Sequence, residues 1–219
     1  MSGQRREVAY ADLEAVPPHR VAERVDGELY VSPRPALHHA RAQGALHNAL
    51  YNPFDQGRGG PGGWLLLFEP ELHLGEDILV PDLAARRRER MPEMPEEVRV
   101  TLAPDWVCEV LSPSTAVLDR EKKMKVYARE GVRHLWLVDP PRQALEVYGL
   151  EGPAGSRWAR TAASPSCAPS PSPHSCWSWV DSGRADYSTS SRDSSRFMSA
   201  SRSTPWRVSR RAAAIALGP

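Results

Sequence analysis

Cysteine is scarce in this chain, and its scarcity excludes two classes of protein. The three cysteines, Cys108, Cys167 and Cys176, are too few and too scattered for a disulfide framework or a zinc site. Long hydrophobic runs are also missing, since the apolar stretch at residues 212–217 is far too short to cross a bilayer. No apolar segment follows residues 1–6, so we expect no signal peptide and predict a cytoplasmic protein without a membrane span.

An excess of charge of one sign is lacking as well. The 28 Lys and Arg residues nearly balance the 27 Asp and Glu residues, which leaves a net charge of +1. A nucleic-acid partner would therefore have to be contacted through a local basic patch.

Residues 52–63 are dense in Gly and Pro and predict a loop. Its glycines do not run from a strand into a helix with a following lysine, so this loop lacks the pattern of a phosphate-binding loop.

Two carboxylates lie inside apolar runs in the middle of the chain. Asp82 belongs to the run Ile78–Ala84, and Glu109 belongs to the run Asp105–Leu111. Such runs are typical of strands that are buried on at least one face. A carboxylate at an interior position costs free energy unless it is paired, hydrogen-bonded or bound to a metal. Because Mg²⁺ takes one or two carboxylates and accepts phosphate oxygens, the pair predicts a magnesium site that cleaves phosphodiesters.

Three motifs follow one another in this part of the chain. They are the Pro81–Asp82 step, the run Glu109–Ser114, and a helix that carries Asp119, Lys123 and Tyr127. Together they resemble the PD-(D/E)XK nuclease superfamily and, more narrowly, the bacterial Uma-type restriction-endonuclease family, over roughly residues 8 to 160. The resemblance implies a DNA endonuclease that uses Mg²⁺, for which Mn²⁺ can substitute.

The resemblance also implies roles for single residues. Asp82 and Glu109 would hold the metal, with the Val110 carbonyl as an additional ligand. The superfamily's usual lysine stands two residues after the acidic member of this strand, where this chain has Leu111. The narrower family places its lysine on the next helix, where it matches Lys123.

From the residues alone, a simpler interpretation of that helix stays open. Asp119 and Lys123 are four residues apart and share one helix face, as an exposed ion pair would. Such a pair contributes about a few tenths of a kcal/mol.

Two residues nearer the N-terminus also match the family pattern. Asp26–Gly27 predicts a two-residue hairpin turn within Val21–Ser32. Glu23 on its first strand is a candidate third acidic group of the catalytic site, or else an exposed glutamate at a strand edge. His39 opens a helix predicted over His38–Tyr51 and is a candidate for contacting nucleic acid, or else a surface or capping residue.

A basic run follows the Asp82 strand directly. Arg86, Arg87 and Arg88 could neutralise DNA phosphates that flank the scissile one. The alternative is a solvated charge run on a loop.

The order of the predicted elements places the chain in the α/β class. Apolar strands flank a single helix over Ala116–Glu130, which Gly131 ends. The strands around Glu109 and Leu137 are therefore candidates for a parallel pair. We expect a restriction-endonuclease-like core over residues 8–163, with a mixed central β-sheet flanked by helices.

The sequence changes character at about Ser164. From there to Ser209 about a third of the residues are serine, interspersed with Pro and Arg, and no periodicity survives. This composition predicts a poorly ordered, low-complexity tail over residues 164–219. A native disordered tail is one interpretation. We favour a frameshift that reads the last strands of the domain out of frame, because the pattern is lost abruptly where the family would continue with a further strand. Aromatic residues such as Trp177, Trp179, Phe197 and Trp206 are also unusual in a disordered linker.

Three functions remain open at this point. The first is a metal-dependent endonuclease that hydrolyses DNA phosphodiester bonds. The second is a catalytically inactive nuclease-fold module that binds DNA or a protein partner. The third is a buried ion-pair network without a function of its own. A homodimer is a further expectation, because cleavage of both DNA strands often requires two active sites.

Overall fold

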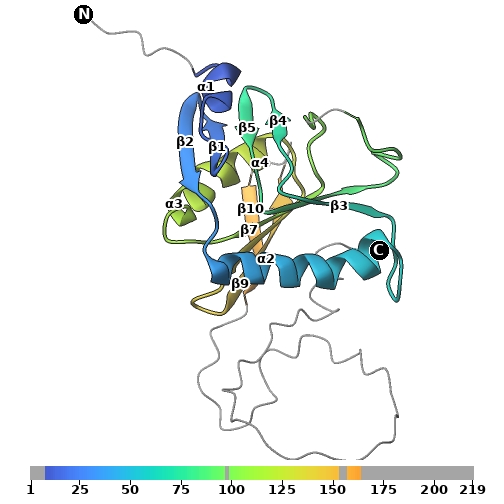
Figure 1. The fold of residues 1–219 in the computed structure, drawn as a ribbon. Helices are drawn as coiled ribbons and strands as arrows, with labels where there is room; N and C mark the ends of the chain where they lie inside the picture. Colours follow the sequence, from blue (N-terminus) through green and yellow to red (C-terminus); the bar gives the residue numbers. More distant parts are fainter. Residues whose placement is uncertain (1–7, 97–98, 153–156, 164–219) are drawn as a thin grey trace, which may run out of the picture.

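A computed structural model of the protein describes residues 8–96, 99–152 and 157–163. The prediction of a poorly ordered or out-of-frame tail over residues 164–219 lies outside the described residues. The described chain forms two β-sheets with helices packed against them (Figure 1), which confirms the predicted mixed α/β class. None of the helices in this described part is long and apolar enough to cross a membrane.

The smaller sheet is antiparallel and has the strand order β2-β1-β5-β4. A short helix, α1 (Tyr10–Glu14), precedes the hairpin that β1 and β2 form. The turn of this hairpin, Asp26–Gly27, has positive φ at both residues, as the sequence predicted. Residues far apart in sequence join this sheet, since Arg24 pairs with Ile78. Its strands are β1 (Arg20–Val25), β2 (Glu28–Pro33), β4 (Leu72–Leu74) and β5 (Asp77–Leu79).

The larger sheet is mixed and has the strand order β10-β9-β8-β7-β6-β3. Strands β7 and β8 are parallel, with Glu109 opposite Leu137, which confirms the predicted parallel pair. The other neighbours are antiparallel. Its strands are β3 (Trp64–Phe68), β6 (Leu83–Arg87), β7 (Trp106–Val110), β8 (His134–Asp139), β9 (Ala144–Glu151) and β10 (Arg157–Ala163).

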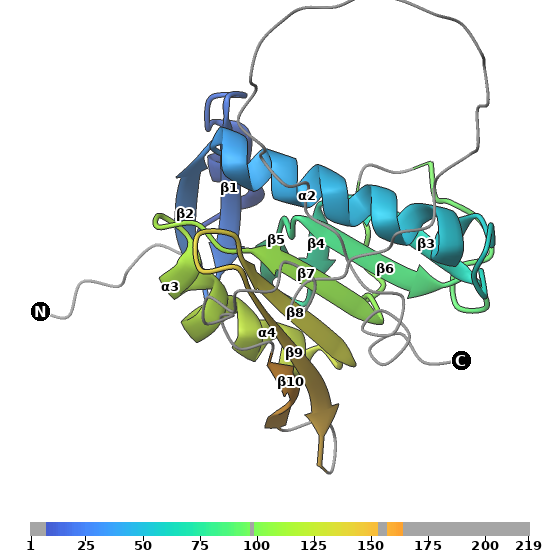
Figure 2. The same ribbon diagram turned by 90° about the horizontal axis from the view of Figure 1, so that it is seen from below.

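Helix α2 (Leu37–Leu50) lies across one face of the larger sheet (Figure 2). Ala42, Leu46 and Leu50 recur every four residues, so they share the helix face that packs on the tryptophans of β3 and β7. The chain continues as a π-helical turn, η1 (Tyr51–Asp55), where the sequence predicted that a loop begins. The loop prediction is wrong for residues 52–55, because Phe54 is buried in the same core and the Asp55 carboxylate accepts the Leu66 N–H.

The opposite face of the larger sheet is covered by the smaller sheet and by the helix that follows β7. That helix was predicted as one continuous element and consists of α3 (Ala116–Leu118), a π-helical turn η2 (Asp119–Lys123) and α4 (Met124–Arg129). Gly131 ends it with φ of 75°, as expected. Val126 and Tyr127 pack against Leu135 and Leu137 of β8, which fixes the helix over the centre of the sheet.

The chain crosses from the smaller sheet to the larger one through residues 80–82. The sequence predicted that Ile78–Ala84 forms one strand, but the structure divides this run between β5 and β6. Pro81 has no N–H to donate to a strand ladder, so it favours this break. Asp82 therefore lies in the crossing rather than within a strand, at the junction of both sheets with the start of α2.

Candidate active site

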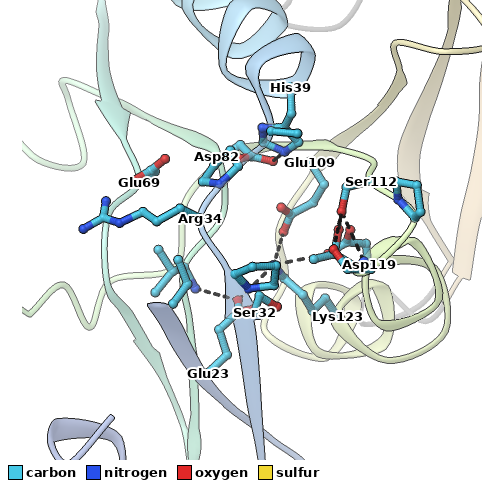
Figure 3. Close-up of a pocket in the computed structure, with 18 residues that line it drawn as sticks. Glu23, Ser32, Arg34, His39, Glu69, Asp82, Glu109, Ser112, Asp119 and Lys123 are labelled. Carbon is cyan, nitrogen blue, oxygen red and sulfur yellow. Dashed lines mark hydrogen bonds and ion pairs between the residues drawn. The ribbon is translucent and has the colours of Figure 1, made fainter. Parts of the chain in front are cut away.

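The crossing segment opens onto a cavity of about 240 Å³. Figure 3 shows side chains converging on it from β1, α2, the crossing, β7 and η2. Because these elements come from distant parts of the sequence, only the folded chain brings their ionisable groups together. The acidic and basic residues that line the cavity are Glu23, Arg34, His39, Glu69, Asp82, Glu109, Asp119 and Lys123.

Glu109 lies at the bottom of the cavity on β7 and is almost fully buried. Its Oε1 accepts a hydrogen bond from the Tyr127 hydroxyl at 2.6 Å and lies 2.8 Å from the Lys123 ammonium. Burial raises the pKa of Glu109 well above its usual range, the Lys123 charge opposes this, and nearby carboxylates add to it. Burial thus disfavours the ionised form of Glu109, and the Lys123 ammonium beside it favours that form.

Lys123 contacts three carboxylates at once. Its Nζ lies 2.8 Å from Glu109 Oε1, 2.9 Å from Glu23 Oε1 and 3.4 Å from Asp119 Oδ1. Burial by itself would lower the pKa of Lys123, but the facing carboxylates raise it well above the usual value. All four side chains are at most 4% exposed. The interpretation of Asp119 and Lys123 as an exposed ion pair is therefore wrong.

The π-helical turn η2 positions two members of this cluster. Asp119 and Lys123 are its first and last residues, and both point toward the sheet. Burial raises the pKa of Asp119 as well, while Lys123 lowers it. Isolated π turns are energetically poor and are frequent at functional sites.

Glu23 reaches the cluster from strand β1. Its Oε1 accepts the Val80 N–H at 2.8 Å as well as the Lys123 ammonium. Since Glu23 is almost fully buried, the alternative of an exposed glutamate at a strand edge is excluded. Through its contact with Lys123, Glu23 connects the smaller sheet to a buried acidic cluster, which consists of Glu23, Glu109 and Asp119 around Lys123.

Asp82 is held from two sides at the rim of the buried cluster. Its Oδ2 accepts the Val110 N–H at 2.7 Å and lies 3.3 Å from His39 Nε2. Burial lowers the pKa of His39, but the hydrogen bond and charge of Asp82 and the nearby Val110 backbone outweigh it and raise the pKa. His39 Nδ1 is buried without a hydrogen-bond partner among the described residues. The alternative of a surface histidine is therefore wrong.

The residues present fit a divalent cation. Within the described chain, the contacts of Asp82 use Oδ2 and those of Glu109 use Oε1, so one oxygen of each is left for a further ligand. No three His, Cys, Asp or Glu side chains of the described residues are arranged to hold a metal ion. Mg²⁺ requires only one or two carboxylates because it keeps several waters. A cation would also offset the negative charge that raises the pKa of Glu109.

The basic run after Asp82 does not reach this cavity. The prediction that Arg86 contacts DNA is wrong, because Arg86 is fully buried in β6 and donates two hydrogen bonds to the Leu102 carbonyl. The interpretation of the run as a solvated loop is equally wrong for this residue. The Arg87 guanidinium lies over the Trp64 ring, and Arg88 pairs with Asp55. DNA contacts by Arg87 and Arg88 stay a prediction.

Sequence reasoning missed three residues that shape the cavity. Gln43 is almost fully buried, and its amide donates to Glu69 Oε1 and to the Asp82 carbonyl. Glu69 lines the cavity and adopts a φ of 45°, which is unusual for a residue other than glycine. Arg34 lines its exposed edge. A signal for Gln43 existed, since it is four residues after His39 and adjoins Ala42 on the apolar face of α2.

Comparison with known proteins adds an independent line of evidence. The sequence profile of the Uma2 family, described as "Putative restriction endonuclease", matches residues 8–173, well over half of the chain. Among solved structures, the crystal structure of a "putative nuclease" from Anabaena variabilis is 22% identical with a TM-score of 0.55. That alignment covers 65% of this chain and 79% of the other. At this identity the likeness shows a shared fold. No curated protein matches the sequence.

Proposed function

This chain belongs to the Uma2 family of putative restriction endonucleases, as its motifs predicted. We propose, on this premise, that it hydrolyses DNA phosphodiester bonds with a divalent cation. One observation carries the proposal. Asp82 from the sheet crossing and Glu109 from β7 line one cavity, and a buried lysine lies 2.8 Å from Glu109. This combination of a carboxylate pair and a cation suits phosphoryl chemistry.

We assign the metal site to Asp82, Glu109 and the Val110 carbonyl. Mg²⁺, or Mn²⁺ in its place, would activate water and stabilise negative charge on the phosphate oxygens. The protein's part is to hold the two carboxylates in place. The Val110 N–H and His39 hold one oxygen of Asp82, and the Tyr127 hydroxyl and Lys123 hold one oxygen of Glu109.

Lys123 acts on the site through charge. Its ammonium lowers the pKa of Glu109 and so favours the ionised form that a metal ligand must have. Glu23 and Asp119 fix the position of that ammonium from the other side. Loss of Lys123 would therefore slow cleavage about a hundredfold, the scale typical of one positioned charged group.

His39 is the proposed contact for the phosphate. It lines the cavity beside Asp82, and its raised pKa favours the charged form, which attracts an anion. The cytoplasmic location and the homodimer stay predictions.

A cleavage assay tests the proposal. Purified protein is incubated with supercoiled plasmid and with the denatured form of the same plasmid, in Mg²⁺, in Mn²⁺ or in chelator. We expect metal-dependent cleavage that Asp82→Asn and Glu109→Gln each abolish. The matched control is Glu121→Gln, which neutralises an exposed carboxylate on η2 outside the cavity and should cleave like the wild type.

The variants separate the proposal from its alternatives. Cleavage that persists in both Asp82→Asn and Glu109→Gln would contradict the assigned site. A folded protein that binds DNA but cuts neither form in either metal would instead be an inactive nuclease-fold module.

A further inference from the structure

The acidic cluster lies deep in the protein. Glu23, Glu109, Asp119 and Lys123 are each at most 3% exposed and form the bottom of the cavity. The cavity above them has a volume of about 240 Å³. Such a volume can take in one phosphate with its sugar but not a segment of duplex.

The exposed lining residues form the mouth of the cavity. One side is the segment 32–36, which links β2 to α2, and the other is the turn 112–115 after β7. Pro33, Pro35 and Pro113 belong to these two segments, and each fixes its own φ angle. The Ser112 hydroxyl also lies 2.9 Å from the hydroxyls of its neighbours in the turn, so this wall is internally bonded. Both walls therefore resist opening.

The lining of the cavity has few basic side chains and can therefore neutralise few DNA phosphates. Proteins that bind duplex DNA commonly neutralise about 6–10 phosphates. Among the described lining residues, the Lys and Arg side chains are Arg34 and Lys123, and Lys123 is buried among carboxylates. Arg86, Arg87 and Arg88 all lie outside this lining, and Arg86 is buried. Arg34 is the exposed arginine of this lining. Its Nη2 donates to the Pro18 carbonyl at 2.9 Å, which leaves its other N–H groups for a strand at the mouth.

We propose that this site acts on unpaired DNA, a single strand or a single-stranded segment, rather than on intact duplex; this rests on the proposed nuclease function. A single strand can turn about its backbone bonds and present one phosphate to the bottom of this cavity. A duplex is stiff over about 150 base pairs and keeps each phosphate on a wide surface. Arg34 then contacts the phosphate of a neighbouring nucleotide outside the mouth.

The test compares two forms of one sequence. The full-length protein is given a circular single strand and the same sequence as a relaxed, closed duplex, in Mn²⁺ and in Mg²⁺. We expect the single strand to be cut at least about tenfold faster, the advantage that about 1.4 kcal/mol confers. A labelled duplex with a central unpaired bubble should be cut within the bubble.

The outcomes distinguish the preference for unpaired DNA from the nuclease function on which it rests. Equal or faster cutting of the relaxed duplex overturns the preference for unpaired DNA and leaves the nuclease function standing. If neither form is cut in either metal by folded protein, the nuclease function itself fails, and this inference fails with it.

Binding supplies a second readout. In the Asp82→Asn background, Arg34→Ala should weaken binding of a fluorescent single-stranded oligonucleotide and reduce the slope of log K against log salt by about 0.7. The matched control is Arg41→Ala, on the exposed side of α2 and outside the cavity lining. An unchanged slope in Arg34→Ala, or an equal change in Arg41→Ala, overturns the placement of the strand at this mouth.

Discussion

Removal of the buried lysine should destabilise the protein in a way that depends on pH. Lys123→Ala leaves three carboxylates, those of Glu23, Glu109 and Asp119, buried without the cation that they share. Breaking a buried pair by removing one partner costs about 3–5 kcal/mol. For a domain of this size each kcal/mol lowers Tm by about 2–4 °C, so we expect a loss of about 6–20 °C at pH 7.

The sign of the pH dependence follows from the carboxylates. Glu109 and Asp119 have raised pKa values in the folded protein, so the folded state binds more protons than the unfolded state. Their contribution to stability is therefore lost as pH rises from the unfolded pKa toward the folded one. Lys123 limits this loss in the wild type, and the variant lacks that compensation. The difference in Tm should be largest at neutral pH and should shrink as pH falls toward about 4, the unfolded pKa of these groups.

Thermal unfolding followed by circular dichroism at several pH values measures this difference. The matched control is Lys122→Ala, whose ammonium contacts Glu28 at a partly exposed position 2.8 Å away and which should leave Tm nearly unchanged. The reasoning would be refuted if Lys123→Ala melted within about 2 °C of the wild type at pH 7. A loss that is the same at pH 5 and pH 8 would refute it as well.

Four further predictions concern the metal, the cluster, the basic run and the tail. With 10 mM Mg²⁺ and a Kd of about 1 mM, the wild type gains about 1.4 kcal/mol, or about 3–6 °C in Tm by calorimetry, and Asp82→Asn does not. Tyr127→Phe removes the hydroxyl that donates to Glu109 and costs about 1.5–3 kcal/mol of unfolding free energy in urea titrations. Arg86→Ala costs about 2–4 kcal/mol in the same titrations, because a large buried side chain and its hydrogen bonds are lost, and leaves the salt dependence of DNA binding unchanged. Reading the coding DNA in another frame near codon 164 should restore an alternating apolar pattern; a frame that yields none would remove the frameshift interpretation.

Local signals in the sequence predicted the elements that local chemistry determines. The Asp26–Gly27 turn, the end of the helix at Gly131 and the parallel strands around Glu109 were all predicted correctly. The separate smaller sheet was not predicted, because it depends on pairing between Arg24 and Ile78, which are far apart in the chain. Periodicity carries no information on which distant strands will pair.

The candidate site could be predicted as a set of residues but not as an arrangement. The residues Asp82, Glu109, Lys123, Glu23 and His39 do line one cavity. The burial of Lys123 among three carboxylates could not be read from its spacing to Asp119, because an exposed ion pair has the same spacing. The prediction for Arg86 failed for a related reason. A run of arginines predicts solvent-exposed side chains, and the sequence does not show that the Leu102 carbonyl accepts hydrogen bonds from a buried Arg86.

The most direct test of the central claim is a measurement of Mn²⁺ binding by electron paramagnetic resonance, made alongside the cleavage rate on the same samples. The account predicts that Mn²⁺ binds the wild type and that cleavage rises with the occupied fraction. It also predicts that Asp82→Asn and Glu109→Gln each lose both binding and cleavage. Tight Mn²⁺ binding that survives in both variants, or cleavage that proceeds at full rate without bound metal, would contradict the claim that these two carboxylates hold the catalytic cation.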